Sequence, residues 1–182
     1  KQFCFHVKQD ESPIWFFGMN PSLLDSTNEY ISRTTPPDKH LFKKLEEEQK
    51  YMHTEIQYFQ RATGFFEEEV KIPELRKPIF HDLYPVRHTN QKEFVKFLED
   101  NDDFCNSLDK ATKNLIDGIM PDIIVIANAK ASKLMQKIFF GRNEYNGETK
   151  LTYELDGKKT DMIFSSMLSG QRALDTYSRS RL

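Results

Sequence analysis

Short continuous apolar runs that end at turn residues recur along the chain. The first clear example is Ile14–Phe17, which stops at Gly18, and the most continuous one covers residues 122–127. Runs of this length are typical of strands that are buried on both faces of a sheet. Strands are therefore expected over residues 14–17, 78–84, 122–127 and 162–164, with a further apolar run at residues 3–7.

Stretches with apolar residues at helical spacing separate these runs. In residues 41–59 the apolar positions recur in steps of three, four or seven, which indicates one buried helical stripe. Gly64 and Gly118 are placed to end two such helices. Residues 65–77 are charged and read as a loop. Helices are expected over residues 41–59, 90–99, 104–118 and 131–138, and after Gly170.

The order of these elements predicts the fold class. Because strands alternate with helices, we expect a single α/β domain over residues 1–182, with three layers (α/β/α) and a central, mostly parallel four-stranded sheet. Leu151, Tyr153 and Leu155 alternate before Asp156-Gly157, which adds a small hairpin. Ligands of such folds bind beyond the carboxyl ends of the strands.

Composition narrows the class of protein. The 182 residues carry a net charge of -2, so a nucleic-acid enzyme would need a local basic face. No apolar stretch approaches about 20 residues, so no membrane span is expected. Cys4 and Cys105 lie far apart, which indicates buried thiols in a reducing compartment rather than a metal site. We expect a cytoplasmic monomer without metal or cofactor.

The first candidate site motif directly follows the strand at residues 14–17. It reads Gly18-Met19-Asn20-Pro21-Ser22. Glycine permits close backbone approach, proline fixes a turn, and the Asn20 amide can donate and accept hydrogen bonds at once. The alternative interpretation is a strand-ending turn with an Asx cap.

This motif resembles the first motif of the uracil-DNA glycosylase superfamily, particularly its mismatch-specific, thymine-DNA and single-strand-selective branches. The resemblance implies that Asn20 positions the attacking water. Residues 37–43 are similar to the family segment that starts the next helix, and Tyr30 lies where the family places a ring that stacks on the flipped base.

Two further strand ends fit the same resemblance. Residues 81–89 resemble the family's central strand and loop, which implies that Asp82 reads the base; the alternative is a cap or a salt-bridge partner. Residues 124–129 resemble a family strand followed by a Gly-Asn-Ala turn, and there Asn128 is the candidate. A buried strand with an asparagine turn explains that segment equally well. His81 and His88 are interpreted as structural or surface residues.

The segment at residues 165–172 resembles the second family motif, which carries the wedge that replaces a flipped base. Met167 and Leu168 are apolar residues in a serine-rich loop, as a wedge requires. The alternative is a helix N-cap with both side chains packed inward. Together the motifs imply catalytic roles for Asn20 and Ser166, and substrate contacts by Gly18, Met19, Pro21, Ser22, Tyr30, Asp82, Asn128, Ser165, Met167, Leu168, Ser169 and Arg172.

The resemblance implies a base-excision DNA repair enzyme that binds a flipped nucleobase and hydrolyses its N-glycosidic bond, with DNA as partner. The second motif has no histidine, Ser22 replaces the usual small or bulky residue, and no carboxylate follows Gly18. A catalytically inactive nucleobase-binding module of the same fold therefore stays open. A third interpretation, an unrelated α/β enzyme that acts on a phosphorylated ligand, has no support because the sequence contains no glycine-rich phosphate-binding motif. Basic residues that could face DNA, or simply solvent, are Lys130, Lys133, Lys137, Arg172, Arg179 and Arg181.

Overall fold

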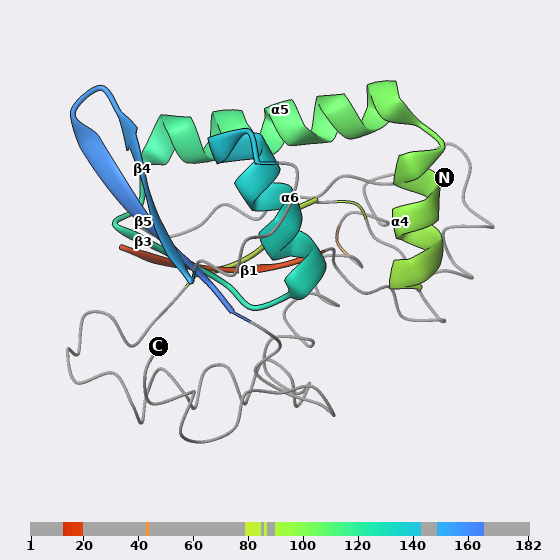
Figure 1. Ribbon diagram of the computed structural model, residues 1–182, viewed down its shortest axis with the longest axis horizontal. Helices are drawn as coiled ribbons and strands as arrows, with labels where there is room; N and C mark the ends of the chain where they lie inside the picture. The colour runs from red at the N-terminus through yellow and green to blue at the C-terminus, as the bar shows by residue number, and fades with distance from the viewer. Residues whose placement is uncertain are drawn as a thin grey trace, which may run out of the picture.

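The computed structural model describes residues 13–19, 43, 79–84, 86, 90–142 and 149–165, and every structural statement below concerns these residues. Five strands and three helices are described (Figure 1). The strands are β1 (Ile14–Gly18), β2 (Ile79–Asp82), β3 (Ile123–Ile126), β4 (Lys150–Leu155) and β5 (Lys158–Phe164). The helices are α4 (Gln91–Glu99), α5 (Asp102–Ile119) and α6 (Ala129–Phe140).

The strands form one five-stranded mixed sheet in the order β2-β1-β3-β5-β4. The first four strands run parallel, and β4 pairs antiparallel with β5. The expected parallel strands and the expected small hairpin are therefore parts of one five-stranded mixed sheet. The seven-residue strand β5 pairs with β3 on one side and with β4 on the other, so the hairpin is the edge of the sheet itself.

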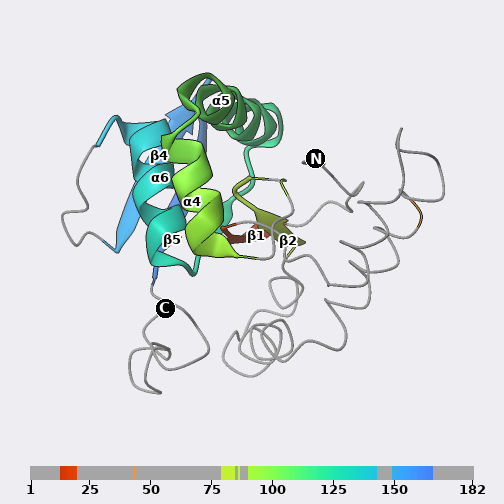
Figure 2. The ribbon, with the colours of Figure 1, turned by 90° about the vertical axis from the view of Figure 1, so that its right-hand side faces the viewer.

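The helices pack on one face of the sheet. The register places Trp15 beside Ile124 and Phe17 beside Ile126, and these residues share a core with Met135 of α6. Phe94 of α4 and Ile116 of α5 belong to the same core. All three helices lie to one side of the strands (Figures 1 and 2). The described residues show an α/β fold, but they show no second helical layer.

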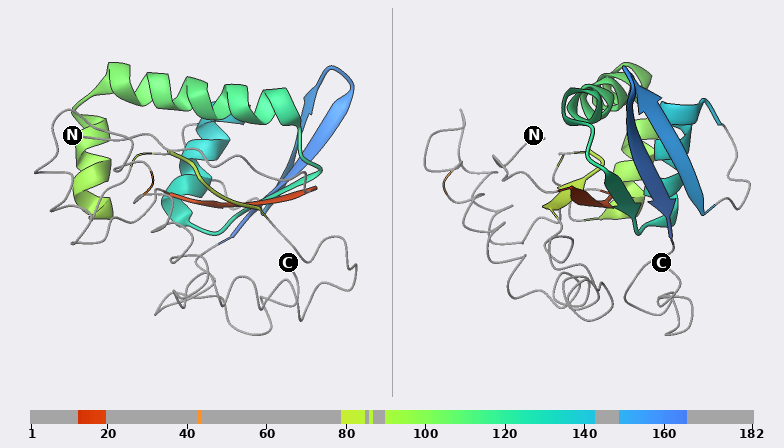
Figure 3. Two further views of the ribbon diagram at one scale, coloured as in Figure 1. Left: turned by 180° about the vertical axis from the view of Figure 1, so that it is seen from behind. Right: turned by 90° about the vertical axis from the view of Figure 1, so that its left-hand side faces the viewer.

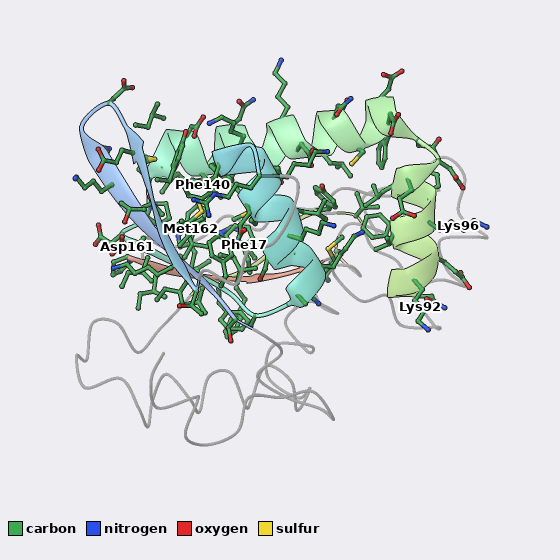
Figure 4. All side chains as sticks on the ribbon, viewed as in Figure 1. Phe17, Lys92, Lys96, Phe140, Asp161 and Met162 are labelled. Carbon is green, nitrogen blue, oxygen red and sulfur yellow. The ribbon has the colours of Figure 1, made fainter. Side chains whose placement is uncertain are left out.

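The face of the sheet opposite the helices is apolar on β1 and β3 and mostly polar on the hairpin. On β1 and β3 it carries Ile14, Phe16 and Val125, all of them buried, so these strands are covered on both faces as the sequence predicts. On the hairpin the same face is mostly polar, with exposed Lys150, Thr152 and Glu154 on β4. Figures 3 and 4 show this hairpin at the end of the sheet, with Asp161 on it and with Phe17 and Met162 toward the helices.

Local chemistry sets the helix ends. Asn90 caps α4 by accepting from Lys92 N at 2.9 Å and Glu93 N at 3.3 Å. Helix α5 passes through Gly118, where the sequence predicts its end, and stops at Ile119 because Met120 is left-handed, with φ 53°. No helix among the described residues is long and apolar enough to cross a membrane.

Several sequence expectations lie outside the described residues. They are the apolar run at residues 3–7, the helix at residues 41–59 apart from Lys43, the loop at residues 65–77 and the helix after Gly170.

Candidate ligand-binding site at the carboxyl edge of the sheet

Four parallel strands end at the same edge of the sheet. Backbone hydrogen bonds tie the chain beyond each strand to its neighbour: Leu83 N donates to Gly18 O at 3.1 Å, and Ser165 N donates to Ile126 O at 2.9 Å. Gly18, Asp82, Asn128 and Ser165 therefore lie along one edge. Since adjacent strands are about 4.8 Å apart, the ends of β1 and β5 are about 10 Å apart, with β3 between them.

Asp82 and Gly18 lie side by side at this edge. They are paired in the register of β2 and β1, so their substituents project from the same face of the sheet. A Cβ atom at Gly18 would lie 2.6 Å from Asp82 Oδ1. Only glycine therefore leaves the carboxylate its place over the end of β1. This face is the one opposite the described helices.

Helix α5 fixes the turn that follows Asp82. Thr112 Oγ1 donates to Leu83 O at 2.5 Å, and the hydroxyl of Tyr84 donates to the Asp109 carboxylate. Tyr84 N also donates to Met19 O at 3.1 Å, which connects the turns after β2 and β1. Because these groups are buried, breaking one bond would leave its partner unsatisfied.

Burial keeps the hydroxyl of Tyr84 protonated. Desolvation, the hydrogen bond to Asp109 and the negative charge of that carboxylate raise the pKa of Tyr84 far above its usual value. Desolvation first, and then the charge of Asp109, raises the pKa of the neighbouring Cys105 thiol. Tyr84 thus stays protonated and able to donate to Asp109 over the whole physiological pH range.

Asn128 is the N-cap of α6. Its Oδ1 accepts from Lys130 N at 3.0 Å and from Ala131 N at 3.1 Å. The alternative that the sequence left open was an asparagine turn after a buried strand; the structure makes Asn128 the cap of the helix that follows. Because the carbonyl oxygen serves the helix, any hydrogen bond from this side chain to a ligand falls to the amide nitrogen.

His81 and Met19 both turn toward the core. The His81 ring lies 4.3 Å from that of Trp15 and 5.2 Å from that of Phe17, measured between centroids. It therefore projects from the face opposite Asp82. Met19 is buried in the same core, so it supports the edge through packing and its backbone carbonyl.

Ser165 is the first residue of the second motif, and it is the only residue of that motif that the structure describes. It is half-buried and follows β5 directly. The other candidates lie outside the described residues: Asn20, Pro21, Ser22, Tyr30, Ser166, Met167, Leu168, Ser169 and Arg172, together with His88, Arg179 and Arg181.

The expected basic face of α6 is described. Lys133 and Lys137 are exposed, as solvated residues would be. Lys130 lies 3.5 Å from Glu99, so part of its charge is balanced within the protein.

Sequence reasoning missed the residues that position the site, namely Tyr84, Asp109 and Thr112. A signal existed in α5, where Asp109 and Thr112 stand on the side of Leu108 and Ile116, which are buried. Polar residues on such a stripe indicate buried hydrogen-bond partners. Their partners could not be named because they lie more than 20 residues away in the chain.

Comparison with known proteins assigns no family. No protein-family model, no curated protein and no solved structure matches the chain. The residues at the carboxyl edge of the sheet are therefore the basis on which a function is proposed.

Proposed function

We propose that the protein binds a flipped nucleobase at the carboxyl edge of its sheet and hydrolyses the N-glycosidic bond of uracil or a related damaged base in DNA. The observation that carries the proposal is the Asp82 carboxylate, which stands over Gly18 at the end of β1. A carboxylate held against backbone in this way is positioned for a specific acceptor role.

The hydrogen-bonding pattern of a base fits this arrangement. A carboxylate accepts the N3–H of uracil or the N1–H of hypoxanthine, while the amide nitrogen of Asn128 can donate to a carbonyl of the base. Asp82 is the last residue of β2 and Asn128 follows β3; these two strands flank β1, so their carboxyl ends are about 10 Å apart. That spacing of the strand ends is compatible with one flat ring placed beyond the end of β1.

The proposed reaction needs no metal. Flipping the base out of the stack costs a few kcal/mol. A water held by Asn20 adds to C1′ as the C1′–N bond breaks, and the bonding electron pair leaves with the base. The proton released by the water ends on the departing base. Backbone and hydroxyl dipoles of residues 165–169 stabilise the negative charge on the base.

Asn20 acts in this scheme by positioning. An amide is too weak a base to remove a proton from water, so rate enhancement comes from orientation of the water and from the charge-stabilising loop. A modest turnover is therefore expected.

A second candidate function is binding of a nucleobase without turnover. It is favoured by the segment at residues 164–172, which contains no histidine to stabilise a leaving base. The two candidates share the binding edge and differ only in the chemical step.

The test uses the full chain with single- and double-stranded oligonucleotides that contain uracil or hypoxanthine. We expect abasic product from the wild type and a loss of about 10- to 100-fold in Asp82→Asn, the worth of one hydrogen bond to a charged group. Asp161→Asn is the matched control. That residue lies on the same face but pairs with Ile123, at the start of β3, and it bonds Lys150 and Thr152 of the hairpin.

The outcomes separate the candidates. Binding that weakens in Asp82→Asn, without abasic product in any protein, identifies the binding module. Equal activity of Asp82→Asn and wild type places the site elsewhere. Neither binding nor product with any substrate, beside an active control enzyme, contradicts both candidates.

A further inference from the structure

Strand β4 forms one edge of the sheet. It is last in the strand order, and its only described neighbour is β5 (Figure 1). Its residues alternate between exposed and half-buried positions. The edge is independent of the proposed site, which lies at the ends of the parallel strands.

The backbone groups that face outward from this edge can be identified. Phe164 N donates to Thr149 O at 2.8 Å, so the groups of Thr149 point toward β5. In an antiparallel pair successive residues alternate in direction. The N–H and C=O groups of Lys150, Thr152 and Glu154 therefore point away from β5 and form the open row of the edge.

The side chains of this row are complementary in charge to those of a second, antiparallel copy of the same strand. In the order Lys150, Thr152, Glu154, a second copy of the strand placed antiparallel around Thr152 brings each lysine opposite a glutamate. Two Thr152 side chains meet at the centre. Centring the pair on Lys150 or on Glu154 would instead place like charges together. From this charge complementarity we infer that β4 docks against β4 of a second copy of the chain.

The charges of β5 extend the complementary pattern. Within one chain Lys150 Nζ lies 2.7 Å from Asp161, and Lys159 Nζ lies 2.6 Å from Glu154. In the paired arrangement Lys150 of one copy stands directly opposite Glu154 of the other, and Glu154 stands opposite Lys159 of its own hairpin, while Asp161 reaches Lys150 diagonally from its position opposite Thr152. Directly opposed unlike charges such as Lys150 and Glu154 favour one register over its neighbours.

The other face of the strand supports the same register. Leu151 and Tyr153 project toward the helices, and the two-fold pairing sets Leu151 of each copy opposite Tyr153 of the other. Hydrogen bonds within one chain hold the Tyr153 side chain in place before any second copy binds. Its hydroxyl accepts from Lys113 Nζ at 2.6 Å and donates to Asp117 at 2.8 Å.

The Tyr153 ring also packs edge-on against Phe139, 4.9 Å away between centroids. Holding an edge residue in one orientation reduces the entropy that association would otherwise cost.

The contact is small. A six-residue strand pair buries less surface than the roughly 1,200 Å² of a stable complex, so the dimer dissociates readily. We expect a monomer–dimer equilibrium with a Kd of roughly micromolar to millimolar. The proposed equilibrium differs from the monomer that the sequence analysis expects.

The first test is sedimentation velocity of the full chain up to about 1 mM, where weak association becomes visible. The wild type is expected to shift toward dimer as concentration rises. Thr152→Pro should stay monomeric, because the lost N–H points outward and proline is tolerated on a free edge. Circular dichroism checks that this variant folds. Lys92→Glu, an exposed lysine on α4 far from the hairpin, is a matched charge control and should dimerise like the wild type (Figure 4).

The second test exchanges the charges. Lys150→Glu makes every edge acidic and Glu154→Lys makes every edge basic, so each variant alone should be monomeric. Mixed together, they present complementary edges and should form a heterodimer, seen by sedimentation of one labelled variant. A wild type that stays monomeric throughout, a dimer that persists in Thr152→Pro, or a mixture without heterodimer would each overturn the inference.

Discussion

At the scale of single residues, the proximity of Asp82 restricts the last position of β1 to glycine. The sequence indicated that Gly18 allows a close approach, but not what approaches it. Asp82 is 64 positions away, and only the pairing of β1 with β2 brings them together. Local sequence reasoning finds such a glycine and cannot name its partner.

Gly18→Ala should damage the site more than the fold. The added Cβ meets Asp82 Oδ1 at 2.6 Å, so the carboxylate must move. We expect a loss of about 1 kcal/mol in unfolding free energy, and a loss of oligonucleotide binding comparable to that of Asp82→Asn. Chemical denaturation and a binding titration measure the two effects.

The control for this substitution is Gly118→Ala. Gly118 lies within α5, and a Cβ there meets nothing within 4 Å. Alanine should therefore stabilise the protein by about 0.5–1 kcal/mol through helix propensity and leave binding unchanged. Unimpaired binding in Gly18→Ala would refute the steric role assigned to the contact.

From the raised pKa of Tyr84 we predict that the unfolding free energy of the protein depends on pH. Its pKa in the folded protein is raised above the unfolded value near 10, so its stabilisation is complete below pH 10 and is lost as the pH rises further. The wild-type unfolding free energy should fall by up to about 1.4 kcal/mol per pH unit from this group. In Tyr84→Phe that component disappears, while stability at neutral pH drops by about 1–2 kcal/mol. Urea titrations between pH 8 and pH 11, at about one-unit steps, compare the slopes; identical slopes would contradict the account.

At the scale of helices and strands, hydrophobic periodicity predicted each described element. It failed at boundaries that depend on neighbours. Helix α5 continues through Gly118, and it ends where Met120 turns left-handed before Pro121. The sequence predicts the hairpin but not that its strand β5 also pairs with β3, because a strand pattern does not encode which strands are neighbours.

The cap of α6 gives a prediction at this scale. Asn128→Ala should lower the unfolding free energy by about 0.5–2 kcal/mol, because two backbone N–H groups lose their acceptor. Asn128→Asp retains the acceptor and removes the amide donor, so it should fold normally and weaken only base binding. Asn101→Ala is the comparison, since Asn101 precedes α5 without a side-chain cap bond. Thermal unfolding that ranks Asn101→Ala as the more damaging change would contradict this.

At the scale of the whole molecule, the order of the strands is what brings the candidate residues together. Periodicity predicts strands but not which of them are neighbours, because pairing is a non-local choice. The order β2-β1-β3-β5 puts Asp82, Gly18, Asn128 and Ser165 side by side. The general rule that ligands bind beyond the carboxyl ends of parallel strands predicts a site at this edge from the sequence; the anchoring of its turns by α5 is seen only in the structure.

The most direct test of the central claim is a two-dimensional amide NMR titration of the full chain with a short uracil-containing single strand. Binding at the carboxyl edge predicts that the perturbed signals gather at Gly18, Leu83, Asn128 and Ser165, while those of the β4–β5 turn, Asp156 and Gly157, stay in place. No perturbation, or perturbations that gather on the hairpin or along α5 instead, would contradict a base-binding site at this edge.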